Sequence, residues 1–106
     1  MRGLMHNIQR VTFESASCIL RKEETHRYSL TNLYSVEVRK GHATGLMQKV
    51  IALADEHDFR IWLTARQYGN PHGMPTELLI PFYKRFGFKL LPQGVMVRDS
   101  QKLHSL

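Results

Sequence analysis

The sequence predicts one mixed α/β (α+β) domain, in which two helices pack against a central, mostly antiparallel sheet. Three observations support this prediction. The chain has 106 residues, the size of a single domain. Apolar residues recur at every second position in several short segments, as in half-buried strands, and at every third or fourth position in one longer segment. That longer segment stands between two apolar strands, which is typical of a crossover within one sheet.

The first half of the chain is predicted to form a hairpin. Apolar and polar residues alternate over residues 10–20, which indicates a half-buried strand. The charged segment RKEET follows as the expected turn, and a second strand is expected over 26–38. Leu30 and Leu33 would fall on opposite faces of an unbroken strand, so we expect a bend or bulge within it.

The centre of the chain is predicted to form the crossover. Over residues 42–57 the apolar residues repeat at three and four, which predicts an amphipathic helix. The apolar segment FRIWLTAR, residues 59–66, follows as a strand in the same sheet as the strand before the helix. The segment 67–75 is rich in Gly, Pro and Asn, and it is expected to be a mobile loop.

The last part of the chain is predicted to contain a second helix and two strands. The helix should cover residues 76–86 and end at Gly87, a common left-handed terminator. Pro81 lies inside this helix and removes one backbone hydrogen bond, so the helix should start late or be kinked. The segments FKLL, residues 88–91, and GVMVRD, residues 94–99, are expected to complete the sheet.

The charge of the chain favours anionic partners in general. The formal net charge is +6 and the isoelectric point is about 9.8. Nucleic acid, an anionic membrane surface and a phosphorylated small molecule would all be attracted. The basic residues, Arg98 among them, are scattered without a run of five, which predicts a solvated surface and argues against a nucleic-acid interface.

Cysteine and histidine usage excludes several classes of protein. The single cysteine, Cys18, cannot form an internal disulfide and is expected to be a buried apolar residue in a reducing, cytoplasmic setting. The six histidines show no pair at metal-ligand spacing, so no metal site is expected. The sequence contains no signal-peptide core and no run of eighteen apolar residues, so we expect neither export by that route nor a membrane span.

One stretch, VEVRKGHATGLMQKVIALAD at residues 36–55, indicates an anion site. The first turn of a helix that follows a strand presents backbone N–H groups without partners, and the helix dipole makes that end positive. Gly41 and Gly45 would let the backbone approach a phosphate, Arg39 and Lys40 would add positive charge, and Thr44 a hydroxyl. The stretch lacks both the Gly-Lys-Ser/Thr loop and the three spaced glycines of dinucleotide sites.

Residues 30–98 resemble the GNAT superfamily of acetyl-CoA-dependent N-acetyltransferases. LYSVEV is similar to the family's bent strand, RKGHATGL to its pyrophosphate loop, FYKRFGF to its tyrosine segment, and MVR to its last strand. The sequence departs from the family at Val38, where Arg or Gln is usual, and at Thr76, where Asn is frequent. The resemblance implies a GNAT-like sheet with a splayed strand pair. It also implies a single domain over residues 1–106 that lacks the amino-terminal strand and helices of longer members.

The resemblance also implies a reaction and a site. Acetyl-CoA would donate its acetyl group directly to a primary amine, with no metal. Backbone N–H groups near Val36 and Val38 would hold the pantetheine arm and polarise the acetyl carbonyl. Tyr83 would protonate the departing thiolate, although a core aromatic is the alternative interpretation. The loop that would bind pyrophosphate consists of Arg39, Lys40, Gly41, His42, Ala43, Thr44 and Gly45.

The residue that deprotonates the amine and the acceptor itself stay open at this stage. Glu37 is the first candidate for the base, with Glu24, His26 and an ordered water as weaker ones. The acceptor is a protein lysine, a protein amino terminus or a small amine, and the short amino end favours an open acceptor face or a homodimer that completes the pocket. Two alternatives remain: a non-catalytic acyl-CoA-binding or protein-interaction module, and a basic nucleic-acid-binding protein.

Overall fold

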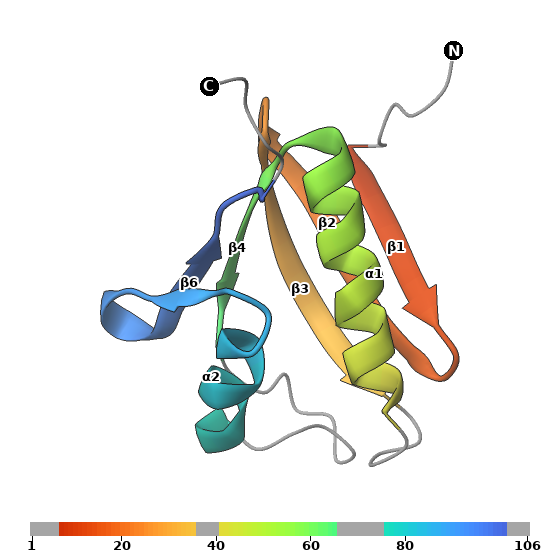
Figure 1. The fold of residues 1–106 in the computed structure, drawn as a ribbon, viewed down its shortest axis with the longest axis vertical. Coiled ribbons are helices and arrows are strands. Elements are labelled where there is room, and N and C mark those ends of the chain that lie inside the picture. Colours follow the sequence, from red (N-terminus) through yellow and green to blue (C-terminus); the bar gives the residue numbers. More distant parts are fainter. Residues whose placement is uncertain (1–6, 36–40, 66–75, 102–106) are drawn as a thin grey trace.

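The computed structural model describes residues 7–35, 41–65 and 76–101, which form a six-stranded sheet and two α-helices (Figure 1). The strands follow the order β1-β2-β3-β4-β6-β5, and every neighbouring pair is antiparallel except β3 and β4. This confirms the predicted mixed, mostly antiparallel sheet. The elements are β1 Ile8–Phe13, β2 Ala16–Glu24, β3 Arg27–Ser35, α1 His42–His57, β4 Arg60–Thr64, α2 Thr76–Lys84, β5 Lys89–Leu90, a 3-10 turn Pro92–Gly94, and β6 Val95–Arg98.

The first predicted strand is in fact two strands. The chain reverses at Glu14 and Ser15, so that Phe13 pairs with Ala16 across a two-residue turn. Glu14 takes a left-handed conformation with φ 52°, a position for which Gly or Asn would have been the usual sequence signal. Residues 21–24 of the segment RKEET therefore belong to β2, and the chain reverses at Thr25 and His26.

The predicted irregularity in the second strand is confirmed. Ser17 pairs with Tyr34 and Ile19 pairs with Thr31, so the register of β2 and β3 shifts between these two pairs. Asn32 lies at this bulge with φ 56°. The bulge is why Leu30 and Leu33 can both contact the core although an unbroken strand would place them on opposite faces.

Among the described residues, the parallel strands β3 and β4 pair over only three residues each. The pairs are Arg27 with Arg60, Tyr28 with Ile61, and Ser29 with Trp62. Beyond this short seam the two strands separate toward the end of the molecule where α1 begins and where α2 lies (Figure 1). The seam and the separation confirm the splayed strand pair, and the crossover through α1 is confirmed as well.

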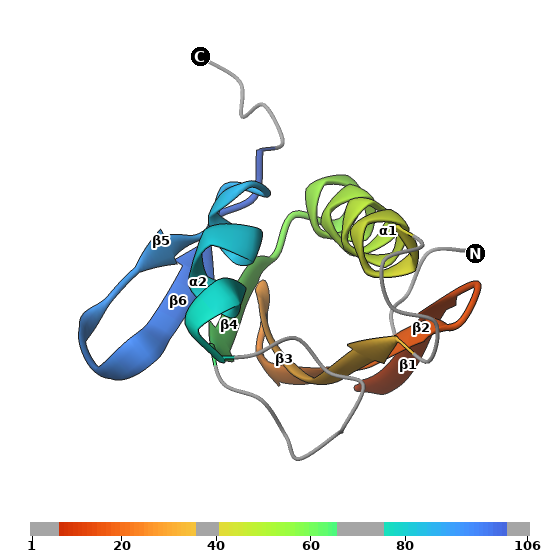
Figure 2. The same cartoon turned by 90° about the horizontal axis from the view of Figure 1, so that it is seen from below.

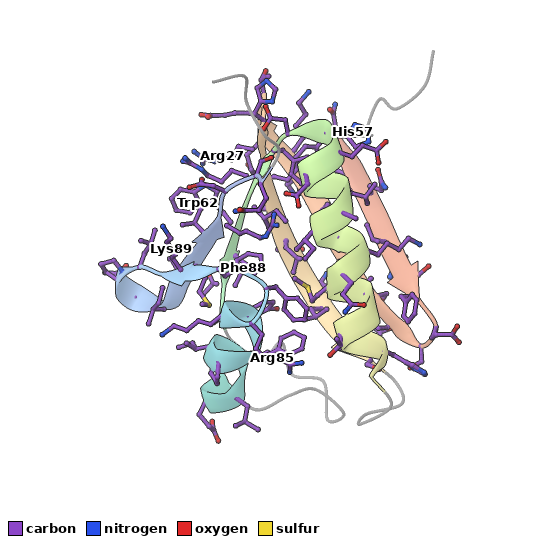
Figure 3. The ribbon with its side chains drawn as sticks, in the orientation of Figure 1. Arg27, His57, Trp62, Arg85, Phe88 and Lys89 are labelled. Carbon is purple, nitrogen blue, oxygen red and sulfur yellow. The ribbon has the colours of Figure 1, made fainter. Side chains whose placement is uncertain are left out.

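Both helices pack on the same side of the sheet (Figure 2). The register gives that inner face the buried residues Val11, Cys18, Leu20, Leu30, Ile61 and Met96. From α1 the side chains of Leu46, Met47, Val50 and Ala54 complete this core, which is the spacing of an amphipathic helix. On the outer face Arg27 stacks on the ring of Trp62, with 5.1 Å between the guanidinium carbon and the ring centroid (Figure 3).

The second helix is slightly shorter than predicted. It ends at Lys84 and a turn continues to Gly87, whose φ of 93° confirms the expected terminator. Pro81 lies within the helix, which nevertheless begins at Thr76. The chain then pairs β5 with β6 in an antiparallel hairpin that contains the 3-10 turn.

Arg98 on β6 is buried, which corrects the prediction that it belongs to a solvated surface. Only 4% of its surface is exposed. Its Nη1 and Nη2 atoms donate to the two carboxylate oxygens of Asp55 on α1, at 3.0 and 3.1 Å. Its Nε atom donates to the carbonyl oxygen of Phe86 at 2.9 Å, and the Gln101 N–H donates to the same Asp55 carboxylate at 2.8 Å. Arg98 therefore links α1 to the turn after α2.

This arrangement predicts an acid-dependent loss of stability. Burial raises the pKa of Asp55, but the hydrogen bonds from Arg98 and Gln101 and the Arg98 charge outweigh it, so the pKa lies below its ordinary value of 3.8. A carboxyl whose folded pKa is lowered stabilises the protein above its unfolded pKa, and loses that effect as the pH falls through the folded pKa. In urea titrations, the wild-type advantage over Asp55→Asn should be full near neutral pH and should shrink below about pH 4. A constant difference down to the acid limit would contradict this.

Candidate functional site

The sequence predicts an anion site at the amino-terminal end of α1. Gly41 precedes the helix with φ 77° and ψ 7°, no side chain among the described residues caps the helix there, and the first turn carries no acidic residue. The carbonyl oxygen of Gly41 accepts the N–H of Gly45 at 2.9 Å, which is the first bond of the helix. The N–H groups of His42, Ala43 and Thr44 precede this bond and have no partner within the helix. A Cβ atom added at Gly41 would meet nothing within 4 Å.

Gly45 differs from the expectation that it leaves room for a phosphate. A Cβ atom on Gly45 would overlap the ring of Phe13, a residue of β1 that is 39% exposed. Its N–H is already used by Gly41. The structure therefore explains the glycine at position 45 by the close approach of α1 to β1, and the predicted anion site is reduced to residues 41–44.

Gly45→Ala should lower the stability of the protein. Overpacking typically costs about 1–3 kcal/mol, and the exposed ring of Phe13 can rotate away, so we expect about 1 kcal/mol. Urea denaturation measures it. Phe13→Ala should remove most of the penalty when combined with Gly45→Ala, and a cost that is the same in both backgrounds would contradict the packing explanation.

His42 belongs to a hydrogen-bond network with Ser15 and Ser35 that the sequence did not indicate. The Ser15 hydroxyl lies 2.8 Å from the Nδ1 atom of His42, and the Ser15 N–H donates to the same atom at 3.4 Å. The Ser35 hydroxyl lies 3.1 Å from that of Ser15. A backbone N–H can only donate, so Nδ1 is an acceptor and the neutral ring carries its proton on Nε2. The turn between β1 and β2 thus fixes the first residue of α1.

Part of the predicted site lies outside the described residues. This applies to Val36, Glu37, Val38, Arg39 and Lys40, and to the loop predicted at 67–75. The last described residue of β3 is Ser35, which belongs to the hydrogen-bond network of His42. The end of β3 at Ser35 therefore lies beside the start of α1.

The two weaker candidates for the base, Glu24 and His26, lie at the opposite end of the molecule. His26 occupies the turn between β2 and β3, and its Nδ1 donates to the carbonyl oxygen of Asp58 at 2.7 Å, just after α1. Because α1 has 16 residues, this end lies about 24 Å from the helix start. Glu24 forms an ion pair with Arg27 there. Both residues are thus too far from the start of α1 for the predicted role.

Tyr83 lies on α2 in the aromatic part of the core. It is 4% exposed, and its ring packs against Phe82 and Phe88 at centroid distances of 5.4 and 5.5 Å. Arg85 lies over the rings of Phe82 and Phe86. A buried core aromatic and a phenol held for proton transfer both fit this position, so the acid role stays a prediction.

The described residues do not support a catalytic cysteine, a metal site or a membrane-spanning helix. Cys18 is fully buried, and burial raises the pKa of its thiol to about 12, so it is not a nucleophile near neutral pH. Residues 7–35, 41–65 and 76–101 contain no group of three or more His, Cys, Asp or Glu that could hold a metal ion. Neither described helix is long and apolar enough to cross a membrane.

Comparison with known proteins gives a fold but no match by sequence. No family model and no curated protein matches the sequence. Among solved structures, the anti-CRISPR protein AcrVA5 is similar with a TM-score of 0.70 and 20% identity, over 87% of this chain and 98% of that one. An acetyltransferase of the GNAT family from Staphylococcus aureus Mu50 has a TM-score of 0.59 and 17% identity, over 80% of this chain.

A third similar structure is that of a protein from Bacteroides thetaiotaomicron, described as an acetyltransferase of the GNAT family. Its TM-score is 0.61 at 14% identity, over 92% of this chain. The present chain spans 59% and 65% of these two longer acetyltransferases. Together with the splayed strand pair, these similarities show that the chain has the GNAT fold.

Proposed function

We propose that this protein is an N-acetyltransferase that transfers the acetyl group of acetyl-CoA to a primary amine. The observation that carries the proposal is the meeting of two features at one end of the molecule. In the part of the chain that the structure describes, the parallel strands β3 and β4 pair only from Arg27 to Ser29 and then separate, and α1 begins at that end without a side-chain cap. The similarity to structures of GNAT acetyltransferases supports the same reaction.

The residues at the start of α1 fit the pyrophosphate of coenzyme A. The N–H groups of residues 42–44 point out of the helix end, where the helix dipole adds positive potential. The space next to Gly41 leaves room for close approach of phosphate oxygens. The ring of His42 would add an Nε2–H donor. Arg39 and Lys40 would contribute the charge that a pyrophosphate attracts.

We propose that the thioester end of the co-substrate lies between the separating strands. Acetyl-CoA supplies an activated acetyl group, and this chain supplies the donors and acids around it. Backbone N–H groups near Val36 and Val38 would stabilise the negative charge that develops on the acetyl oxygen. Tyr83 would give its phenolic proton to the departing sulfur. Glu37, two residues beyond Ser35, would accept the proton of the amine.

Two measurements test the proposal. Isothermal calorimetry should detect coenzyme A binding to the wild-type protein, and a thiol-release assay with acetyl-CoA should detect turnover with polyamines, aminoglycosides or protein substrates. Binding without thiol release for any acceptor would favour a non-catalytic acyl-CoA module. Salt-sensitive binding of RNA or DNA with no heat from coenzyme A would favour the nucleic-acid alternative and overturn the proposal.

The same assay separates the two classes of acceptor. With acetyl-CoA labelled in its acetyl group, label retained in the protein fraction of a cell lysate identifies a protein lysine or amino terminus. Label confined to small molecules identifies a small amine.

A further inference from the structure

We propose that Arg98 is a positioning residue that holds the α2 turn, and through it Tyr83, in place relative to α1. This inference rests on the proposed function, because it assigns the acid role to Tyr83. It starts from an unusual placement for an arginine. Arg98 is 4% exposed and pairs with the buried Ile61, which places it on the inner face of the sheet, where it bonds to Asp55 of α1 and Phe86 after α2. A buried guanidinium is costly unless it is paired with an opposite charge and hydrogen-bonded.

The donors of Arg98 are divided between two elements. The bidentate pair with Asp55 fixes the guanidinium to the last part of α1. The Nε–H donates to the carbonyl oxygen of Phe86 in the turn after α2. One planar group therefore sets the distance between α1 and this turn, because a guanidinium holds its donors in a fixed fork.

The contacts of that turn lead to Tyr83. The Phe86 N–H donates to the carbonyl oxygen of Tyr83 at 2.9 Å, and the Phe88 N–H lies 3.4 Å from the same oxygen. The ring of Phe88 packs against the ring of Tyr83 at 5.5 Å. Gly87, between them, has φ 93°, and a Cβ atom there would lie 3.5 Å from Arg98 Nε. The carbonyl oxygen that Arg98 holds thus belongs to the turn that sets both the backbone and the ring of Tyr83.

The position of Arg98 and Asp55 in the fold explains why their contact would matter for Tyr83. Among the described strands, β4, β6 and β5 join the rest of the sheet only through the three-residue seam between β3 and β4. Tyr83 lies with the strands on one side of the separation, whereas the start of α1 lies with those on the other. Arg98 and Asp55 are a second connection between the two sides. Proton transfer needs donor and acceptor at about 2.6–3.2 Å, so a small change in this connection would slow it.

A double-mutant cycle tests the inference. We expect Arg98→Lys to lower kcat about 10-fold in the wild-type background with little change in the affinity for coenzyme A, because lysine can pair with Asp55 but cannot also bond to Phe86. In the Tyr83→Phe background the same substitution should change the remaining turnover less than about 2-fold. Equal effects in the two backgrounds would overturn the inference, because a general structural defect acts whether or not the phenol is present.

The exposed pair of Arg60 and Asp99 provides a matched control. It joins β4 to the residue that follows β6, and its side chains are 50% and 59% exposed. Asp99→Asn should leave kcat unchanged in both backgrounds. A loss of turnover as large as that of Arg98→Lys would show that any weakening of this region slows the enzyme.

Hydrogen exchange gives a readout that does not depend on activity. Arg98→Lys should speed exchange of the amides of Phe86 and Phe88, while amides of β2 such as that of Ile19 exchange at the wild-type rate. Unchanged exchange at the turn would overturn the inference. A wild-type protein that neither binds coenzyme A nor releases thiol would instead overturn the proposed function, and the exchange data would still decide whether Arg98 orders the turn.

Discussion

Replacing Tyr83 by phenylalanine should lower kcat by at least about 100-fold, the usual contribution of a general acid in an active site. The phenol would protonate the sulfur as the thioester breaks, and phenylalanine keeps the aromatic packing with Phe82 and Phe88 but has no proton to give. Coenzyme A affinity should be nearly unchanged, since the N–H groups at the start of α1 are not altered. Steady-state thiol release and calorimetry measure the two quantities separately.

Tyr28 provides the matched control for this substitution. It is buried to the same extent as Tyr83, with 4% of its surface exposed, and it packs against Phe59 at the opposite end of the molecule. Tyr28→Phe should lower stability slightly and leave kcat unchanged. If both substitutions reduced turnover alike, or if Tyr83→Phe left it intact, Tyr83 would be a core residue and the acid would have to be sought elsewhere.

Replacing Asp55 by alanine should destabilise the protein by about 3 kcal/mol, because it leaves the buried charge of Arg98 without its carboxylate. The Asp55 side chain is itself 33% exposed, which places the expected cost at the lower end of the range for broken buried pairs. For a domain of this size the melting temperature should fall by more than about 10 °C. Thermal and urea denaturation at neutral pH measure the effect.

Two further variants show whether the cost comes from the unpaired charge. Asp99→Ala breaks the exposed pair with Arg60 and should cost less than about 1 kcal/mol. Combining Asp55→Leu with Arg98→Met removes both charges and should recover much of the stability lost by Asp55→Ala. A double variant as unstable as Asp55→Ala would show that the bond to Phe86, rather than the ion pair, carries the stabilisation.

The sequence predicted those elements whose local pattern is strong. The helix at 42–57 and the strand within 59–66 were predicted because their apolar residues recur regularly. The bulge was predicted because Leu30 and Leu33 would fall on opposite faces of an unbroken strand. The turn at Glu14 was missed because a glutamate in the left-handed region carries no local signal, although the pairing of Phe13 with Ala16 stabilises it.

The contacts of the candidate site were harder to predict than the elements. In the hydrogen-bond network of His42, Ser15 lies 20 positions from Ser35 and 27 positions from His42 along the sequence. Only the tertiary structure brings these residues together. The burial of Arg98 depends likewise on Asp55, 43 positions away. Scattered charges and serines look alike in a sequence, so a motif can identify a helix start but not the side chains that support it.

The short seam between β3 and β4 gives this protein a built-in optical probe. Trp62, the single tryptophan of the chain, occupies the last paired position before the strands separate, and Arg27 stacks on its ring. The indole emission spectrum responds to the polarity and charge around the ring. Any ligand that widens or narrows the gap between the strands should therefore shift the fluorescence of the unlabelled protein, which would allow stopped-flow recording of such movements without an attached dye.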